Sequence, residues 1–504
     1  MSRDRDKVHV EANVIEDLFT TFFLNYAPDV PILDPLQSPN KYYSRSPLLF
    51  WAILTVASRR YAADPSLLLS LSNATFQFAL QQIDSPAADI HTVEALVLLL
   101  SWQFPSTQQH EESGYVMSGA LIHLAFKYGL HTAESSQDFV RVKLNLSECE
   151  VRRRRQLWAA CIVVYQENSA MIGNACLQIP APLICKEIIR LKCQEPILRL
   201  HLQGIITRAN NAFDENGFAI ETAGEERTLN ILIRAYEDEI KMAESHYQNL
   251  TMKEKLYVYF AHLQIQAMNF FKPPDKIDNV SLGRLYSVAT SLVESVAELE
   301  MDTDFIRYST AYLMRSMALA TCILLRLIKT PFVEFINADE AKSLFLTALQ
   351  LMQKFSVANN DAPARCATAV SRLWRSDRVF KNPDGSHNLR LRVRTRYGMS
   401  LMWDCMWWCR EEFMGQEGAY SRLPPSESNM TDTQQAAAAR PQQLSEQATA
   451  EPSPSQQVPL SFDWSMDDWF FNPDLNMQDG QWDVPINLMD SVDPVPALKL
   501  TILP

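Results

Sequence analysis

Apolar side chains recur at helical spacing along most of the chain, and this pattern predicts a body built of helices. Residues 14–25, 47–61 and 66–83 each carry an apolar stripe on one side of a predicted helix. Residues 90–102 are almost entirely apolar on their inner side, which places that helix at the centre of the fold. Few segments alternate between apolar and polar residues with a period of two, so we expect an all-α fold.

Short signals at helix ends support this prediction. Gly129 follows the apolar stripe of residues 111–128, at the position where a glycine commonly ends a helix in a left-handed conformation. Ser147 and Glu150 have the spacing of a capping box, so a new helix should begin there. Further helices follow to residue 413, and we expect about 12–14 helices in all.

Composition favours long helices and an intracellular protein. Only 13 of the 504 residues are glycine, which is less than half of the usual share of about 7%. The nine cysteines are an odd number and include no Cys-x-x-Cys pair, as expected of reduced thiols inside a cell. Residues 311–328 form the longest apolar run, but Arg315 and Arg326 interrupt it, so we expect a buried core helix and no membrane contact.

The distribution of charge divides the chain into a body and a tail. Residues 1–440 contain 45 basic and 49 acidic side chains, whereas residues 441–498 contain ten acidic side chains and no Lys or Arg. Low apolar content and uncompensated charge are typical of segments that do not fold alone. We therefore expect four parts, namely an N-terminal extension (1–13), a large helical domain (14–420), a disordered polar linker (421–460) and an acidic, aromatic tail (461–504).

Six aromatic side chains lie among the acidic residues of the tail. Repulsion between carboxylates keeps such a segment open, and its aromatics are then free to dock in a groove of a partner. This is the composition of a transcriptional activation tail. We predict that transcriptional coactivators bind Phe462, Trp464, Trp469, Phe470, Phe471 and Trp482. The alternative is that the tail folds back onto the body.

Basic side chains gather between residues 365 and 396, where nine Lys or Arg stand against two Asp. Such a cluster is most simply a solvated surface, but it also fits a docking patch for the acidic tail or a nuclear import signal. The candidate residues are Arg375, Arg378, Lys381, Arg390, Arg392, Arg394 and Arg396.

A second basic run occupies residues 152–155 at the start of a predicted helix. Four consecutive side chains point around the whole helix, so they cannot form one binding face. We expect some of them to face solvent and others to pair with acids, with an import signal as the alternative.

No motif for catalysis emerges from the sequence. The chain has no Gly-x-Ser-x-Gly elbow, Walker loop, GxGxxG or His-Glu-x-x-His sequence. Cys405 and Cys409 stand four apart on a helix, but zinc normally takes four ligands, so packing in the core is the better interpretation. We expect that the chain is not an enzyme and holds no metal or cofactor.

A series of segments between residues 91 and 180 resembles a known family. In order they are residues 93–99, residues 119–125, Gly129-Leu130-His131, residues 152–158, and Gly173-Asn174-Ala175 with Ile179-Pro180. This order is similar to the middle homology region of fungal zinc-cluster transcription factors, and loosely to the branch of weak-acid-response and secreted-protease regulators. The likeness is clear over residues 14–200 and looser over residues 200–415.

The resemblance implies an all-α regulatory domain, a nuclear location and control of transcription by RNA polymerase II. It also implies an N-terminal cluster of six cysteines that binds zinc, whereas the first cysteine here is Cys149, inside the helical body. Zinc and direct DNA contact are therefore expected only from a segment that precedes this one. Otherwise the regulator reaches DNA through a partner.

Two functions are open at this point. The chain is expected to be a transcriptional activator, specific for a pathway or gene cluster, whose tail recruits coactivators. The alternative is an interaction or decoy protein that binds coactivators or a partner, as a homodimer or heterodimer. A further expectation is that the tail docks on the basic patch until a signal releases it, through an attraction that salt weakens.

Overall fold

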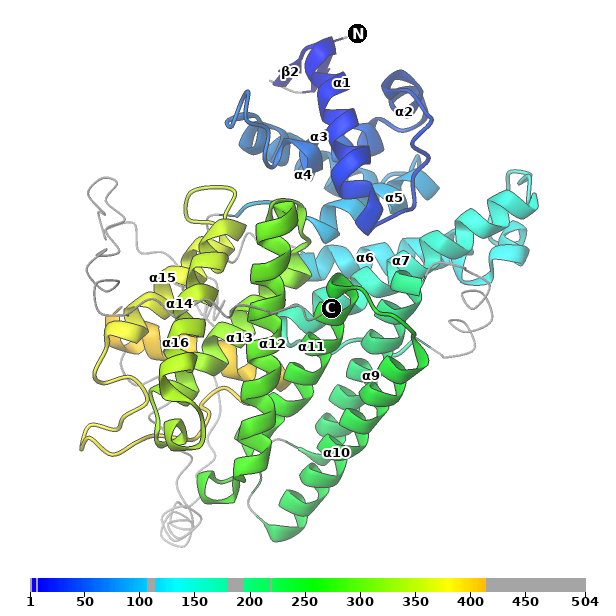
Figure 1. The fold of residues 1–504 in the computed structure, drawn as a ribbon. Coiled ribbons are helices and arrows are strands. Elements are labelled where there is room, and N and C mark those ends of the chain that lie inside the picture. Colours follow the sequence, from blue (N-terminus) through cyan, green and yellow to red (C-terminus); the bar gives the residue numbers. More distant parts are fainter. Residues whose placement is uncertain are drawn as a thin grey trace, which may run out of the picture.

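The computed structural model describes residues 2–5, 8–106, 114–179, 194–217, 220 and 222–413. These residues are almost entirely helical, which confirms the predicted all-α fold. Figure 1 shows helices α1–α5 gathered at one end of the molecule, α9–α16 forming the larger part at the other end, and α6 and α7 crossing between them.

The first part of the chain is built around two apolar helices that lie side by side. Its elements are β1 (Arg3–Arg5), β2 (Val8–Val10), α1 (Ala12–Thr21), α2 (Pro39–Arg45), α3 (Pro47–Ser58), α4 (Leu67–Ile83), α5 (Ile90–Ser101), α6 (Gly114–Lys127) and α7 (Glu148–Ile172). Helices α3 and α5 are buried along nearly their whole length and pack against each other. The predicted central position of residues 90–102 is therefore confirmed.

The second part of the chain is a larger bundle around α13. Its elements are α9 (Gln194–Asn216), α10 (Ala223–His246), α11 (Met252–Gln266), η5 (Ala267–Phe271), α12 (Asn279–Thr303), α13 (Ala311–Ile328), α14 (Ala338–Phe355), α15 (Ala362–Arg375), η9 (Tyr397–Met399) and α16 (Ser400–Phe413). Among the described residues, α13 is the helix long and apolar enough to cross a membrane, but 89% of it is buried by its neighbours. It is a core helix, as predicted.

Helix α7 belongs to both hydrophobic cores. Its middle, with Leu157 and Trp158, packs in the first core, and its end, with Ala170 and Met171, packs in the second. Between these two stretches, Glu167 forms a buried double hydrogen bond with Arg199 of α9, at 3.0 and 2.8 Å. The two parts of the chain are thus joined through a continuous buried helix.

The predicted ends of the helices around α7 are largely correct. Gly129 has a φ of +64° after α6, and the Ser147 hydroxyl accepts a hydrogen bond from the backbone N–H of Glu150 at the start of α7. The capping box is nevertheless incomplete, because the Glu150 carboxylate accepts from Nε of Arg154 at 3.1 Å instead.

The basic run at residues 152–155 divides between solvent and ion pairs, as predicted. Arg152 is exposed and lies 3.6 Å from Glu148 in an exposed pair, whereas the other three side chains are more buried and also pair with carboxylates. The pairs are Arg153 with Glu94, Arg154 with Glu150, and Arg155 with Glu134. Arg153 and Arg155 therefore tie α7 to its neighbours, whereas the pair of Arg154 with Glu150 lies within α7.

The structure adds two elements that the sequence did not predict. The N-terminal extension forms a β-hairpin, in which Arg3 pairs with Val10. In the Pro-rich crossing, which is residues 28–39, the hydroxyl of Ser38 caps the short helix α2. Pro39 stands in the first turn of that helix, where a backbone N–H has no partner within the helix and its absence costs nothing. Both elements are too short to show a hydrophobic period.

Candidate docking surface

The six predicted tail residues lie outside the described part of the chain, which ends at Phe413. They are Phe462, Trp464, Trp469, Phe470, Phe471 and Trp482. Their binding of coactivators stays a prediction. The structure does place the other candidate set, the basic segment that follows α15.

The basic segment begins where α15 ends. Ser376 turns the chain there, because its hydroxyl accepts from the backbone N–H groups of Arg378 and Val379 at 3.0 and 3.1 Å. The chain then runs out to a tight turn, in which Asp384 accepts from the backbone N–H of Ser386 at 2.9 Å. Gly385 has a φ of +84° at this turn, a conformation that favours glycine.

A buried ion pair holds the returning half of the segment. Arg326 of α13 donates from Nη1 to Oδ2 of Asp404 on α16 at 2.6 Å, and both side chains are fully buried. The Nη2 of Arg326 also donates to the backbone oxygen of Leu389 at 3.0 Å, and Oδ1 of Asp404 accepts from the backbone N–H of Arg392 at 2.6 Å. One ion pair therefore fixes the backbone on both sides of Arg390.

Three of the seven candidate residues are engaged within the fold. Arg392 pairs with Glu411 and lies 3.7 Å from the ring centre of Trp408. Arg394 donates to the backbone oxygen of Leu391 at 3.1 Å. Arg396 donates to the side chain of Asn174 at the end of α7. These three side chains are therefore already bonded within the chain and do not depend on a binding partner.

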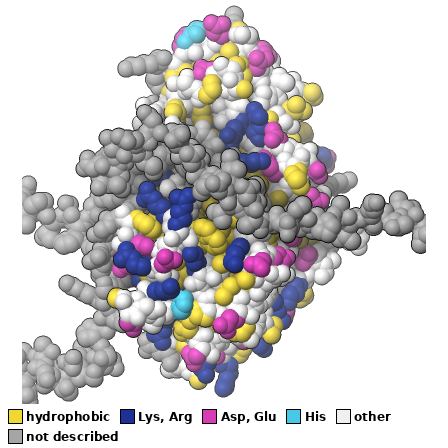
Figure 2. All heavy atoms as spheres, turned by 60° about the vertical axis from the view of Figure 1, so that its left-hand side comes forward, with side chains coloured by type: hydrophobic (Ala, Val, Ile, Leu, Met, Phe, Trp, Pro, Cys, Tyr) yellow, Lys and Arg dark blue, Asp and Glu magenta, His cyan; other side chains and the backbone are white. Residues whose placement is uncertain are grey.

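The other four candidate residues face outward and form what we call the basic surface. Arg375, Arg378 and Arg390 are exposed, and Lys381 is half-buried. One of them, Arg378, pairs with Glu412 of α16, whose Oε1 lies 3.7 Å from Nε of Arg378. Figure 2 shows this side of the molecule, where Lys and Arg side chains stand among apolar and acidic ones. Its role as a docking patch or import signal stays a prediction.

The end of the basic segment also clamps the end of α7. Gly173 follows α7 with a φ of +68°, and a Cβ atom added there would lie 2.2 Å from the backbone oxygen of Arg396. Trp403 of α16 donates from its indole N–H to the backbone oxygen of Ile172 at 3.0 Å. The motif Gly173-Asn174 is thus a contact point between two distant parts of the chain.

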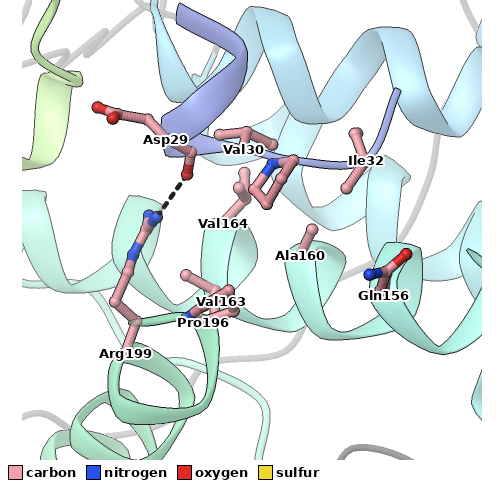
Figure 3. A pocket seen from close by; sticks show the side chains of 10 residues that line it. Asp29, Val30, Ile32, Gln156, Ala160, Val163, Val164, Pro196 and Arg199 are labelled. Atoms are coloured by element: carbon pink, nitrogen blue, oxygen red, sulfur yellow. Dashed lines mark hydrogen bonds between the residues drawn. The ribbon is translucent and has the colours of Figure 1, made fainter. Parts of the chain in front are cut away.

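A small apolar hollow lies between the Pro-rich crossing and α7. Figure 3 shows Val30 and Ile32 facing Ala160, Val163 and Val164 of α7, with the Arg199 guanidinium bonded to the backbone oxygen of Asp29 at one end. The hollow has a volume of only about 40 Å³. Small-molecule sites usually span about 300–1,000 Å³, so this hollow is too small for one.

The first part of the chain is similar to a domain of known proteins. Residues 19–174 match the fungal specific transcription factor domain. The putative transcription factor SEF1 of Eremothecium gossypii is 24% identical over 424 residues, covering 80% of this chain and 39% of that protein. The transcriptional regulatory protein SEF1 of Candida albicans is 23% identical over 439 residues, covering 80% and 45%. The regulatory protein LEU3 of Saccharomyces cerevisiae is 19% identical over 466 residues, covering 80% and 52%.

These matches confirm the resemblance to fungal transcription factors that the sequence indicated. The chain spans about half, or less, of the length of the curated relatives that it matches. The matched domain ends at Asn174, the residue whose side chain Arg396 contacts.

Proposed function

We propose that this chain, which carries a fungal specific transcription factor domain, regulates transcription by RNA polymerase II in a fungal nucleus, as an activator rather than as an enzyme. The observation that supports this proposal is that the likeness to named transcription regulators extends well beyond residues 19–174, to 80% of the chain. A shared domain alone would say less than a match across both cores.

The body and the tail have separate tasks in this proposal. The helical body is the regulatory platform, because its two cores are joined by α7 and by buried ion pairs such as Arg199 with Glu167. The acidic, aromatic tail recruits coactivators. DNA is reached through a zinc-binding segment that precedes this sequence or through a dimer partner.

A reporter fusion tests the tail. Residues 441–504 are joined to an unrelated DNA-binding domain, and the four central aromatics Trp464, Trp469, Phe470 and Phe471 are changed to Ala. We expect reporter expression to fall at least fivefold, because only Phe462 and Trp482 of the six aromatic anchors then remain.

The matched control changes four polar residues of the same fusion, Ser453, Ser455, Gln456 and Gln457, to Ala. This control should keep its reporter expression. If the aromatic variant keeps its expression as well, the tail is not an activation segment. A protein that acts by capturing a partner would then be the better proposal.

A further inference from the structure

A polar cleft of about 430 Å³ lies between α10, the start of α12 and the α11–η5 junction. Helix α10 contributes Arg234, Glu237 and Lys241 to it, and α12 contributes Arg284. Gln266, the last residue of α11, lies in the same lining. The volume falls within the range of small-molecule sites, unlike that of the apolar hollow beside α7.

The inner wall of the cleft presents two hydrogen-bond acceptors without partners. Glu237 is only 3% exposed and Gln266 only 5% exposed. Within the described residues, Oε1 of each side chain has no hydrogen-bond partner. Burying such an acceptor without a partner destabilises a fold, and more so when the acceptor is charged.

Nearby cations do not satisfy the Glu237 carboxylate. Its other oxygen, Oε2, lies 3.7 Å from Nη1 of Arg284, which is beyond hydrogen-bond distance. The buried ammonium of Lys272 donates to Oδ1 of Asn269 at 2.6 Å instead. Among the described residues, the Glu237 carboxylate is thus left incompletely paired.

The position of Glu237 in the sequence points the same way. The buried side chains of α10 are Leu229, Ile233, Glu237, Ile240 and Ala243, which form one stripe at helical spacing. A leucine at position 237 would continue that stripe and remove a buried charge, a replacement that often stabilises a fold. A carboxylate at such a place indicates a use other than folding.

The outer edge of the cleft has the opposite chemistry. Arg234, Lys241 and Arg284 all line it and are exposed. Lys241 pairs with Asp238 at 3.0 Å in an exposed pair, and such pairs are weak. Asp278 also lines the cleft, but it caps α12 by accepting from the backbone N–H and the hydroxyl of Ser281 at 2.8 Å. The three cations outnumber the two outer carboxylates, so the cleft suits a ligand with a donor group at its inner end and an anion at its outer end.

We propose that this cleft binds a small zwitterion with the chemistry of a free α-amino acid. The ammonium group of the ligand donates to Glu237 Oε1 and Gln266 Oε1, and its carboxylate lies towards Arg234, Lys241 and Arg284. Binding does not depend on any promoter, so the proposal stands or falls apart from the transcriptional function.

Binding to the purified full chain tests this proposal. Each of the twenty common α-amino acids is added singly at about 10 mM in a thermal unfolding assay, and isothermal titration calorimetry follows for those that raise the melting temperature. We expect at least one to bind, because ligands that bind only the folded state raise its stability. The amine that lacks the carboxylate of the bound amino acid should bind at least tenfold more weakly.

Two variants locate the site, and a third serves as the control. Glu237→Gln and Gln266→Met should each weaken binding at least tenfold without lowering the melting temperature of the unliganded chain. Glu298→Gln removes an exposed carboxylate from the neighbouring helix α12 and should leave binding unchanged. The second inner-wall variant keeps the test informative if the first one folds poorly.

Two results would overturn the proposal. One is that none of the twenty amino acids shifts the melting temperature or releases heat. The other is that an amino acid binds the chain with Glu237→Gln as tightly as it binds the unchanged chain.

Discussion

Arg326 on α13 and Asp404 on α16 meet in the interior with both side chains fully buried, 2.6 Å apart. The pair also bonds the backbone at Leu389 and Arg392. The pair therefore does more than neutralise two charges. It also provides hydrogen-bond partners for the backbone oxygen of Leu389 and the backbone N–H of Arg392. The basic surface is presented on this anchored backbone.

Removing one partner of this pair should be costly. We expect Asp404→Asn to lower the free energy of unfolding by about 3–5 kcal/mol, because it leaves the buried guanidinium of Arg326 uncompensated. Urea denaturation measures the change. Asp339→Asn is the control, since Asp339 pairs with Lys342 at an exposed site and should change stability by less than about 1 kcal/mol. Equal effects of the two substitutions would show that burial of the pair is unimportant.

The clamp at the end of α7 predicts a difference between two glycines. Gly173 and Gly217 both have a positive φ, but a Cβ atom at Gly173 would strike the Arg396 backbone, whereas none of the described residues lies within 4 Å of one at Gly217. We expect Gly173→Ala to cost about 1–3 kcal/mol more than Gly217→Ala, because only the first adds a clash to the backbone strain. Comparable melting temperatures for the two variants would contradict the clamp.

Stability should depend on the protonation of His262. Burial lowers the pKa of His262 to about 4, and the charge of Lys241 acts in the same direction. The unfolded chain protonates this histidine below about pH 6.5, whereas the folded chain does so only near pH 4. The stabilisation is therefore complete above pH 6.5 and is lost as the pH falls towards 4.

The size of this pH effect is on the order of 3 kcal/mol. Urea titrations at several pH values should show that His262→Gln removes this part of the slope between pH 6.5 and 4. His246→Gln, at an exposed position on α10, should keep the slope. An unchanged slope in the His262 variant would mean that this histidine has the same pKa in the folded and the unfolded chain.

Docking of the tail on the basic surface gives a prediction that depends on salt. Limited trypsin digestion at low salt should cut after Lys381 and Arg390 faster when residues 461–498 are deleted, because the tail then no longer covers the segment. Arg375→Glu combined with Arg378→Glu should have the same effect, and added salt should erase the difference. The control variant, Arg152→Glu with Lys342→Glu, makes the same change of charge on α7 and α14 and should leave the digestion rate unchanged. Identical digestion with and without the tail would exclude docking.

The sequence predicts those features that depend on neighbours along the chain. Periodicity was sufficient for α5 and α13, and the caps at Gly129 and Ser147 follow from local chemistry. The pairing of Arg326 with Asp404 joins residues 78 positions apart, so no local pattern indicates it. Glu237 did carry a signal, as an acid within an apolar stripe, but its meaning required knowing that the stripe is buried.

The structure was also needed to tell which arginines of the basic segment are exposed and which are bonded within the fold. Arg390, Arg392, Arg394 and Arg396 alternate regularly in sequence, yet only Arg390 is exposed. The other three meet a carboxylate, a backbone carbonyl and the end of α7. Counting charges along the sequence identified the cluster, but it could not distinguish the arginines that bond within the fold from those that face solvent.

The contact of Arg396 and Trp403 with the end of α7 determines which range of residues can be expressed as a folded fragment. The family match stops at Asn174, but the last turn of α7 lies in the second core and is capped by residues more than 220 positions later. A fragment that ends at residue 174 would leave Ala170 and Met171 uncovered in water. The segment that matches the family domain is therefore smaller than the unit that folds, and expression of the body should extend at least to Phe413.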